Sequence, residues 1–340
     1  MAPPTQLPTR KLGRNGPEIP AVGLGLMGMS VAYGTPGSDE DRLKVLDRAW
    51  ELGCVNWDTA HMYGDSEELL GKWFDLHPER RQDIFLATKF GLSAQLKTDS
   101  SPEYCREQCE TSLRRLKSSY IDLFYIHRVD GITPIEKTVA AMAELKREGK
   151  IRYLGISAPS SETLRRACAV EHIDTMQVEY SPWSLEVEGP ESTNLLQTCR
   201  ELGITTFAYS PLGRGFMTGQ IKSLDDIPQG DLRRLVPRFN AENFPKNLIL
   251  VEKFKELAAK KKCTPGQLAI AWLMAQGEDV IPIPGTKNIK YLEENVGAAY
   301  VLLSKDEEAE VRSWVSDIGV SGLQMAPGVI TDYGNTPPLE

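Results

Sequence analysis

The dominant feature of the sequence is a repeat of apolar runs and amphipathic segments. After a Pro-rich start, a short run of apolar and β-branched residues recurs roughly every 30 residues, and each run precedes a loop and a stretch with helical periodicity. A period of that length suits a strand joined to a crossover helix. The runs predict eight strands at residues 21–26, 55–58, 84–89, 121–127, 151–157, 175–180, 205–210 and 280–283.

The arrangement of the predicted strands selects one α/β architecture. The runs are continuously apolar rather than alternating, as expected for parallel strands covered on both faces. Gly23, Gly25 and Gly28 match the first-turn spacing of an open doubly wound sheet, but we predict no helix straight after them. Eight units therefore predict a closed (β/α)₈ barrel, the TIM type. The predicted helices are residues 39–52, 66–76, 102–116, 134–148, 161–170, 191–202, 247–261 and 265–275.

Three segments fall outside the repeat. A chain of 340 residues can form a single barrel domain, so we expect one domain over residues 1–340. The Asn15-Gly16 pair predicts a β-hairpin at about residues 10–20, as a plug or edge element. Residues 213–245 break the period and are interpreted as a lid loop. Residues 91–101 form a shorter excursion, and the Gly- and Pro-rich tail, about 319–340, is expected to fold back over the barrel mouth.

Composition excludes several classes of protein. The net charge of −8 and pI near 5.3 argue against nucleic-acid binding, which needs clustered Lys and Arg. No segment resembles a signal peptide or a membrane span. The six cysteines contain no C-x-x-C pair, and Cys105 and Cys109 are expected to pack a helix, so we predict free thiols in an intracellular, cytoplasmic protein. The Arg233-Arg234 run is interpreted as a solvated face. Nothing in the pattern indicates the oligomeric state.

Polar residues end several of the apolar strands. In an α/β barrel the C-terminal ends of all strands meet at one rim, where active sites are built. Residues far apart in sequence are therefore expected to converge there. The residues concerned are Asp58, Lys89, His127, Ser157, Gln177, Glu179, Tyr209 and Ser210.

Four residues could form a site for acid–base catalysis at that rim. Lys89 paired with Asp58 would stay cationic, and an ammonium beside Tyr63 would stabilise the phenolate that forms when the phenol gives up its proton. His127 would hold a carbonyl oxygen in line. Such a group suits reduction of a carbonyl or oxidation of an alcohol, provided that a hydride carrier lies alongside.

Each residue also has a simpler interpretation. Taken alone, Asp58 could be a structural ion pair, Lys89 a solvated strand end and His127 a core histidine, but their coincidence at matching strand ends favours a shared function. Two rivals stay open: a regulatory or redox-sensing subunit that binds a cofactor with little turnover, and a lyase in which Lys89 forms a Schiff base with a carbonyl substrate. An adjacent Asp58 that keeps the lysine protonated argues against the lyase.

A series of short motifs runs in order between Leu12 and about Tyr300. The motifs are Asp58-Thr59-Ala60-x-x-Tyr63-Gly64, Leu86-Ala87-Thr88-Lys89, residues 121–127, Gly155-Ile156-Ser157, Gln177, Tyr209-Ser210-Pro211-Leu212, Ile283-Pro284-Gly285-Thr286-Lys287 and Glu293-Glu294-Asn295. Together they resemble those of the aldo-keto reductases, which are NADPH-dependent (β/α)₈ barrels. Judged by residues 125–130 and 336–339, the chain most resembles the plant and fungal subgroup of perakine-reductase-like and pyridoxal-reductase-like enzymes.

The resemblance implies an enzyme that reduces an aldehyde or ketone to an alcohol by hydride transfer from NADPH. Tyr63 would be the general acid, Lys89 and Asp58 its tuning pair, and His127 the residue that orients the carbonyl of a small-molecule substrate. NADPH is favoured over NADH, because Lys287 at the start of the last barrel helix would bind the 2′-phosphate.

The resemblance also implies where each part of the cofactor would lie. Ser157 and Gln177 would hold the nicotinamide carboxamide and Tyr209 would stack on its ring, while Glu294 and Asn295 would hold the adenine. The full set of implied NADPH/NADP+ contacts is Gly25, Leu26, Met27, Asp58, Ser157, Gln177, Tyr209, Ser210, Pro211, Leu212, Gly215, Gly285, Thr286, Lys287, Tyr291, Glu294 and Asn295.

Three positions depart from the family pattern. Ala158 stands where many members have Asn, so one carboxamide contact is missing or replaced. Tyr291 stands at a position that is often Arg, which puts weight on Lys287, with Lys290 as an alternative. His61 replaces a residue that is often acidic in the subgroup and could face the substrate. The implied substrate contacts are His61, Met29 and Arg128, and no metal site is expected.

Overall fold

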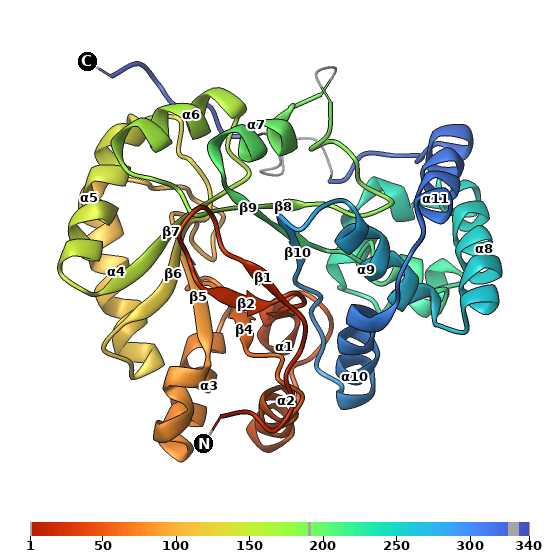
Figure 1. The fold of residues 1–340 in the computed structure, drawn as a ribbon, viewed down its shortest axis with the longest axis horizontal. Helices are drawn as coiled ribbons and strands as arrows, with labels where there is room; N and C mark the ends of the chain where they lie inside the picture. Colours follow the sequence, from red (N-terminus) through yellow and green to blue (C-terminus); the bar gives the residue numbers. More distant parts are fainter. Residues whose placement is uncertain (1, 190–191, 326–332, 340) are drawn as a thin grey trace.

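Eight parallel strands form the centre of the computed structural model, which describes residues 2–189, 192–325 and 333–339 (Figure 1). Each strand pairs with the next strand along the chain, so the order in the sheet follows the sequence. All eight predicted strands are confirmed, with shifts of one to three residues at some ends. They are β3 Leu24–Gly25, β4 Asn56–Asp58, β5 Phe85–Phe90, β6 Ile121–Ile126, β7 Ile151–Ser157, β8 Thr175–Glu179, β9 Thr205–Tyr209 and β10 Val280–Pro282.

The first and last strands meet and close the barrel. Gly25 bridges Gly285 in parallel, the amide of Gly23 donates to the carbonyl of Pro282 at 2.9 Å, and that of Gly25 donates to Pro284 at 3.1 Å. A Cβ at Gly25 would lie only 2.9 Å from the carbonyl oxygen of Ile283, so glycine permits the close approach. The predicted (β/α)₈ barrel is therefore confirmed.

Helices surround the sheet on all sides in the view of Figure 1. The predicted helices are confirmed as α2 Asp39–Glu51, α3 Ser66–Leu76, α4 Pro102–Leu116, α5 Ile135–Arg147, α6 Ser161–Val170, α7 Leu195–Leu202, α8 Phe244–Lys261 and α9 Pro265–Ala275. For α7, the predicted start at residue 191 lies outside the described residues, and the prediction of helix at residues 192–194 is wrong, because Asn194 adopts a left-handed conformation and the helix begins at Leu195. Local chemistry explains several starts: the Ser101 hydroxyl accepts the amide of Tyr104 with Pro102 in the first turn, and Thr264 and Gln267 form a capping box.

Two further helices complete the ring, and one prediction is wrong. They are α10 Ile289–Gly297 and α11 Lys305–Ile318. A single helical turn, α1 Met27–Ser30, opens straight after β3, where we predicted no helix. Its four residues do not change the fold, because the β3–β10 contacts close the sheet.

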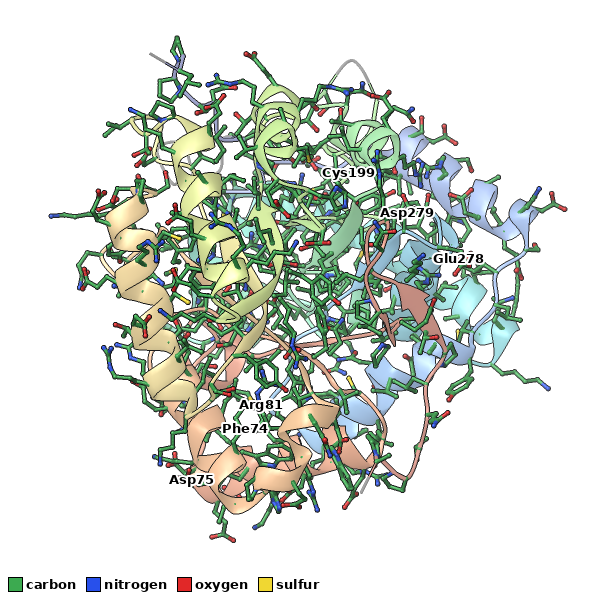
Figure 2. All side chains as sticks on the ribbon, turned by 60° about the vertical axis from the view of Figure 1, so that its left-hand side comes forward. Phe74, Asp75, Arg81, Cys199, Glu278 and Asp279 are labelled. Carbon is green, nitrogen blue, oxygen red and sulfur yellow. The ribbon has the colours of Figure 1, made fainter. Side chains whose placement is uncertain are left out.

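The N-terminal hairpin closes the end of the barrel opposite the strand C-termini. Its strands are β1 Thr9–Lys11 and β2 Glu18–Pro20, and Leu12 and Ile19 pack with Phe85, Phe207 and other side chains of the barrel interior. Charged groups at this end are paired, for example Arg81 with Asp122 at 2.9 Å and Arg200 with Asp279 at 2.9 Å; Figure 2 labels Arg81 and Asp279. The other end of the barrel is left open for a site.

Three more observations concern the cysteines, membrane spans and metal sites considered in the sequence analysis. All six cysteines are free thiols, as predicted, and Cys105 and Cys109 are buried in the helix layer. Within the described residues, no helix is long and apolar enough to cross a membrane. In the same part of the chain, no cluster of three or more His, Cys, Asp or Glu side chains could hold a metal ion.

Candidate active site

A cavity of about 870 Å³ opens at the C-terminal ends of the strands. Loops that follow β3, β4, β5, β6, β9 and β10 contribute to its wall, together with Gln324 and Met325 of the tail. Its volume lies within the range of roughly 300–1,000 Å³ that is typical of small-molecule sites. The predicted polar residues at the strand ends therefore lie around a cavity large enough for a small molecule.

The polar centre of the cavity is a buried Asp58–Lys89 ion pair. Lys89 is completely inaccessible to solvent and Asp58 is 3% exposed. The Lys89 ammonium contacts the Asp58 carboxylate and donates to the carbonyl of Thr59 at 2.8 Å, while Gln177 donates to the other carboxylate oxygen at 2.7 Å. Burial opposes the charge on Lys89, but Asp58 and Tyr63 outweigh it, so the pKa of the ammonium is raised. The lysine is therefore held as a cation.

Tyr63 stands between this cation and the cavity. The turn between β4 and α3 presents it: the Tyr63 amide donates to Ala60, the Ser66 amide donates to Tyr63, and Gly64 adopts a φ of 55° that favours glycine. The Tyr63 hydroxyl lies 3.4 Å from the Lys89 ammonium, and the side chain lines the cavity. A proton on this phenol thus has a cation on one side and the cavity on the other.

His127 forms the adjacent part of the wall. Its ring meets that of Tyr63 edge to face, with centroids 5.8 Å apart. Burial, followed by the charges of Lys89 and Arg128, lowers the pKa of His127 well below its ordinary value, so the imidazole is neutral at pH 7. Its buried Nδ1 has no hydrogen-bond partner within the described chain. A neutral imidazole carries one N–H and can hold a carbonyl oxygen without transferring charge to it.

The remainder of the cavity runs from this centre to the start of α10. Every residue that the resemblance implies as a cofactor contact lies in the cavity wall, from Gly25 on β3 to Asn295 on α10. The Lys287 ammonium donates to the carbonyls of Tyr33 and Thr35 at 2.9 and 2.8 Å, and Glu294 accepts from Thr264 at 2.7 Å. The Tyr291 hydroxyl donates to Gln220 at 2.9 Å, which joins α10 to the lid loop.

Three of the predicted site residues lie outside the cavity wall. Lys89 lies behind Tyr63, beside the phenol that we predict it tunes. Met29 is fully buried in the hydrophobic core, so its predicted contact with substrate is wrong for this structure. His61 is absent from the cavity wall as well, since its Nδ1 lies 2.9 Å from the carbonyl of Lys89 and its Nε2 lies 3.4 Å from the Tyr104 hydroxyl. Arg128 is the one predicted substrate contact that lines the cavity.

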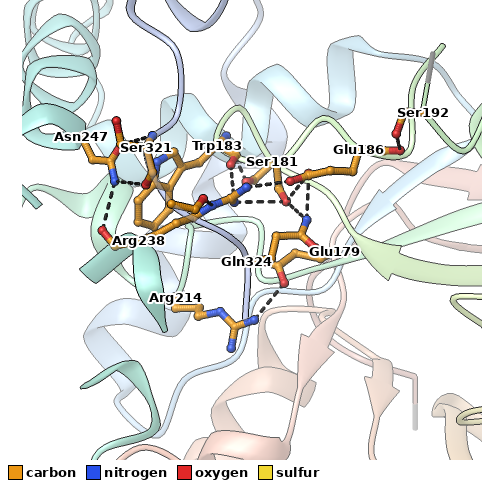
Figure 3. A network of polar contacts seen from close by, with 12 residues as sticks. Glu179, Ser181, Trp183, Glu186, Ser192, Arg214, Arg238, Asn247, Ser321 and Gln324 are labelled. Carbon is orange, nitrogen blue, oxygen red and sulfur yellow. Dashed lines mark hydrogen bonds and ion pairs between the residues drawn. The ribbon is translucent and has the colours of Figure 1, made fainter. Parts of the chain in front are cut away.

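The lid loop supplies residues that the sequence did not single out. Arg214, with a φ of 57°, reaches from the lid to Glu179 at the end of β8, and the two form a buried ion pair at 2.8 Å (Figure 3). Arg233, predicted to lie on a solvated face, instead lines the cavity, pairs with Asp231 at 2.8 Å and lies over the ring of Tyr33. The sequence showed that Glu179 is a polar residue at the end of a strand. Its ion-pair partner, Arg214, could not be predicted, because it depends on the path of the lid loop.

The tail reaches the cavity through a polar network. The Arg238 guanidinium donates to the carbonyls of Gly322 and Trp183 and to Glu186, while Gln324 donates to Glu186 at 2.8 Å (Figure 3). These bonds hold residues 321–325 against the loop after β8. Further along the chain, the amide of Gly334 donates to the carbonyl of Ala158 at 2.9 Å. The described parts of the tail therefore lie at the rim of the barrel, one against the loop after β8 and the other against the end of β7.

Comparison with known proteins gives a consistent result. A model of the Aldo/keto reductase family matches residues 21–315. Aldo-keto reductase str7 of Strobilurus tenacellus is 53% identical over 321 residues, which cover 93% of this chain and 94% of that protein. Aldo-keto reductase yakc of Schizosaccharomyces pombe, whose name specifies NADP(+), is 47% identical over 341 residues, with coverage of 98% and 99%. The crystal structure of a thermostable aldo-keto reductase with the inhibitor epalrestat is 30% identical, with a TM-score of 0.71 and coverage of 90% and 99%.

Proposed function

This chain belongs to the aldo/keto reductase family and is an oxidoreductase, and we propose that it uses NADPH to reduce an aldehyde or ketone to an alcohol, with Tyr63 as the general acid. The observation that carries the proposal is the contact of the Tyr63 hydroxyl with a buried, charged Lys89 at 3.4 Å. An ammonium at that distance stabilises the phenolate that Tyr63 becomes when it protonates the carbonyl oxygen.

The remaining residues of the centre orient the reacting groups. Asp58 keeps Lys89 charged, and His127, neutral at pH 7, would hold the carbonyl oxygen near the Tyr63 hydroxyl. Gln177 fixes the second oxygen of Asp58 and also lines the cavity, so it links the ion pair to the proposed carboxamide site. Together these contacts would position one carbonyl oxygen beside one proton donor.

The cavity fits NADPH by its chemistry. Tyr209 and Ser157 lie in the wall near the polar centre, and at the other end Lys287 is a cation that, among the described residues, is paired with no carboxylate. We propose that this lysine exchanges its carbonyl partners for the 2′-phosphate. When bound, the reduced nicotinamide would supply a hydride to the carbonyl carbon.

We also propose that residues 1–340 act as one domain, with residues 213–245 as a lid on the cofactor. Gly215 and Arg233 of that loop lie in the cavity wall. Tyr33 faces them from the loop after α1, where Ala32 accepts the amide of Leu232 at 3.5 Å. The two loops therefore meet across the cavity, and a cofactor beneath them would be shielded from water.

The rival functions are less well supported. A Schiff-base lyase needs a free amine that a substrate can reach, whereas Lys89 is inaccessible and held by Asp58, Thr59 and Tyr63. A redox sensor with little turnover needs no proton donor, so the Tyr63–Lys89 contact favours an enzyme.

The proposal is tested by Tyr63→Phe in an NADPH oxidation assay with a panel of aldehydes, ketones and quinones. We expect kcat to fall by roughly 10² to 10⁴, because the proton donor is lost, while NADPH still binds. Tyr120→Phe is the matched control, since Tyr120 lies before β6 at the opposite end of the barrel. Wild-type turnover in Tyr63→Phe would remove Tyr63 from the mechanism, and tight NADPH binding by the wild type without turnover of any compound would favour the sensor.

A further inference from the structure

The charged groups around the reacting end of the cavity are paired, with one exception. Glu179 is paired with Arg214, Asp58 with Lys89, and Arg233 with Asp231. Arg128, the residue after His127, also lines the cavity, yet within the described chain no carboxylate forms an ion pair with it. Its charge is therefore not balanced by the described protein.

Arg128 makes two geometrically defined hydrogen bonds in the described chain, fewer than the five N–H groups of a guanidinium allow. One terminal nitrogen, Nη1, makes both of its hydrogen bonds in the described chain, to the carbonyl of His127 at 2.7 Å and to the Ser157 hydroxyl at 2.8 Å. The buried Nε has no partner there. A half-buried guanidinium with an unpartnered N–H is costly unless an acceptor binds it. These contacts place the group beside His127, at the end of the cavity where the carbonyl would react.

We propose that Arg128 binds a carboxylate of the substrate, so that the enzyme prefers oxo acids, compounds that carry a carboxylate close to the reacting carbonyl. The proposal rests on the function proposed above. A guanidinium presents a planar fork of donors that matches a carboxylate, and a partly buried cation attracts an anion more strongly than one in water. Lys287 is the only other wall cation of the described chain with no ion pair, and it lies at the far end, where the 2′-phosphate is proposed.

The position of Arg128 limits where the carboxylate can be. Because its Nη1 contacts the Ser157 hydroxyl and the backbone of His127, a bound carboxylate would lie within a few bonds of a carbonyl held by the His127 ring. A carboxylate on the adjacent carbon, as in a 2-oxo acid, fits this arrangement better than one on the far side of an aromatic ring.

The test compares each oxo acid with its own ester, which has the same carbon skeleton but no charge. The probes are phenylglyoxylate with its ethyl ester and 4-formylbenzoate with its methyl ester, each assayed by NADPH oxidation with the wild type, Arg128→Gln and Arg128→Lys. We expect the acid-to-ester ratio of kcat/KM for phenylglyoxylate to fall about 10- to 100-fold in Arg128→Gln, the usual contribution of a charged hydrogen bond, mainly through KM. Arg128→Lys should retain part of the preference, and the ratio for 4-formylbenzoate should change less.

The matched control is Arg152→Gln, the same change of charge at the opposite end of the barrel, where Arg81 still pairs with Asp122. If Arg128→Gln lowers kcat/KM equally for acid and ester, Arg128 only supports Ser157 and the proposal is overturned. A second readout, calorimetric binding of benzoate and benzamide to the NADP+ complex, does not need turnover. Weaker benzoate binding in Arg128→Gln supports the proposal even if every carbonyl tried is inert, a result that would refute the proposed function alone. Equal benzoate affinity in the two proteins overturns the carboxylate site.

Discussion

Replacing Lys89 by Met is the perturbation whose consequence follows most directly from the structure. Lys89 is inaccessible to solvent and Asp58 is 3% exposed, so no solvent screening reduces their interaction. Without the ammonium, Asp58 keeps only the donor of Gln177 at 2.7 Å and becomes a buried, unpaired carboxylate. Removing one partner of such a pair typically lowers the free energy of unfolding by about 3–5 kcal/mol.

This energy can be converted into a melting temperature. An unfolding entropy of about 2.1 cal/mol/K per residue gives about 0.7 kcal/mol/K for 340 residues, so Tm should fall by about 4–7 °C. Because the pKa of Lys89 is raised, the stability due to its charge is complete below its ordinary value of 10.5 and is lost only as pH rises through the higher folded value. Calorimetry at pH 7 therefore measures the full effect.

A second variant separates stability from catalysis. Asp58→Asn in the Lys89→Met background removes the unpaired charge while Gln177 can still donate to the amide oxygen, so it should recover at least half of the lost Tm. Turnover should remain at least about 100-fold below wild type in both variants, because no cation faces Tyr63. The reasoning is refuted if Lys89→Met melts within 1 °C of the wild type, or if the double variant is no more stable than the single one.

The other predictions concern pH and the cofactor. Burial and nearby cations lower the pKa of His127, so kcat/KM should show no inflection from this residue between pH 6 and 8; an inflection that vanishes in His127→Gln would contradict a neutral imidazole. Arg42 lowers the pKa of Asp65 from 3.8 to about 2, so the stability from this pair should be complete above pH 4 and be lost as pH falls towards 2. Asp65→Asn should flatten the stability curve in that interval, and an unchanged slope would exclude the pair. Lys287→Glu should weaken NADPH at least about 10-fold more than NADH in fluorescence titrations, whereas the control Lys290→Glu, outside the cavity wall, should not; equal losses of both cofactors would place the phosphate site elsewhere.

Local patterns in the sequence were sufficient to predict the framework. Strand positions follow from continuous apolar runs, and helix starts such as Ser101-Pro102 follow from capping chemistry within four residues. The barrel then places the C-terminal ends of all strands on one rim, so Asp58 and His127 could be predicted to meet without knowledge of any contact between them. The motifs alone also indicated the residues before and on α10 that we propose as cofactor contacts.

Only the tertiary structure decided how side chains share that rim. His61 is near Tyr63 in sequence and Met29 is near the predicted cofactor contact Met27, yet the backbone points His61 at the carbonyl of Lys89 and buries Met29 in the core. The partner of Glu179 is Arg214, which lies on a loop whose path depends on packing against residues distant in sequence. A repeating strand pattern determines which residues reach the rim because its period is local. Which charges are paired there, and which is left for a ligand, depends on contacts between loops that no local pattern encodes.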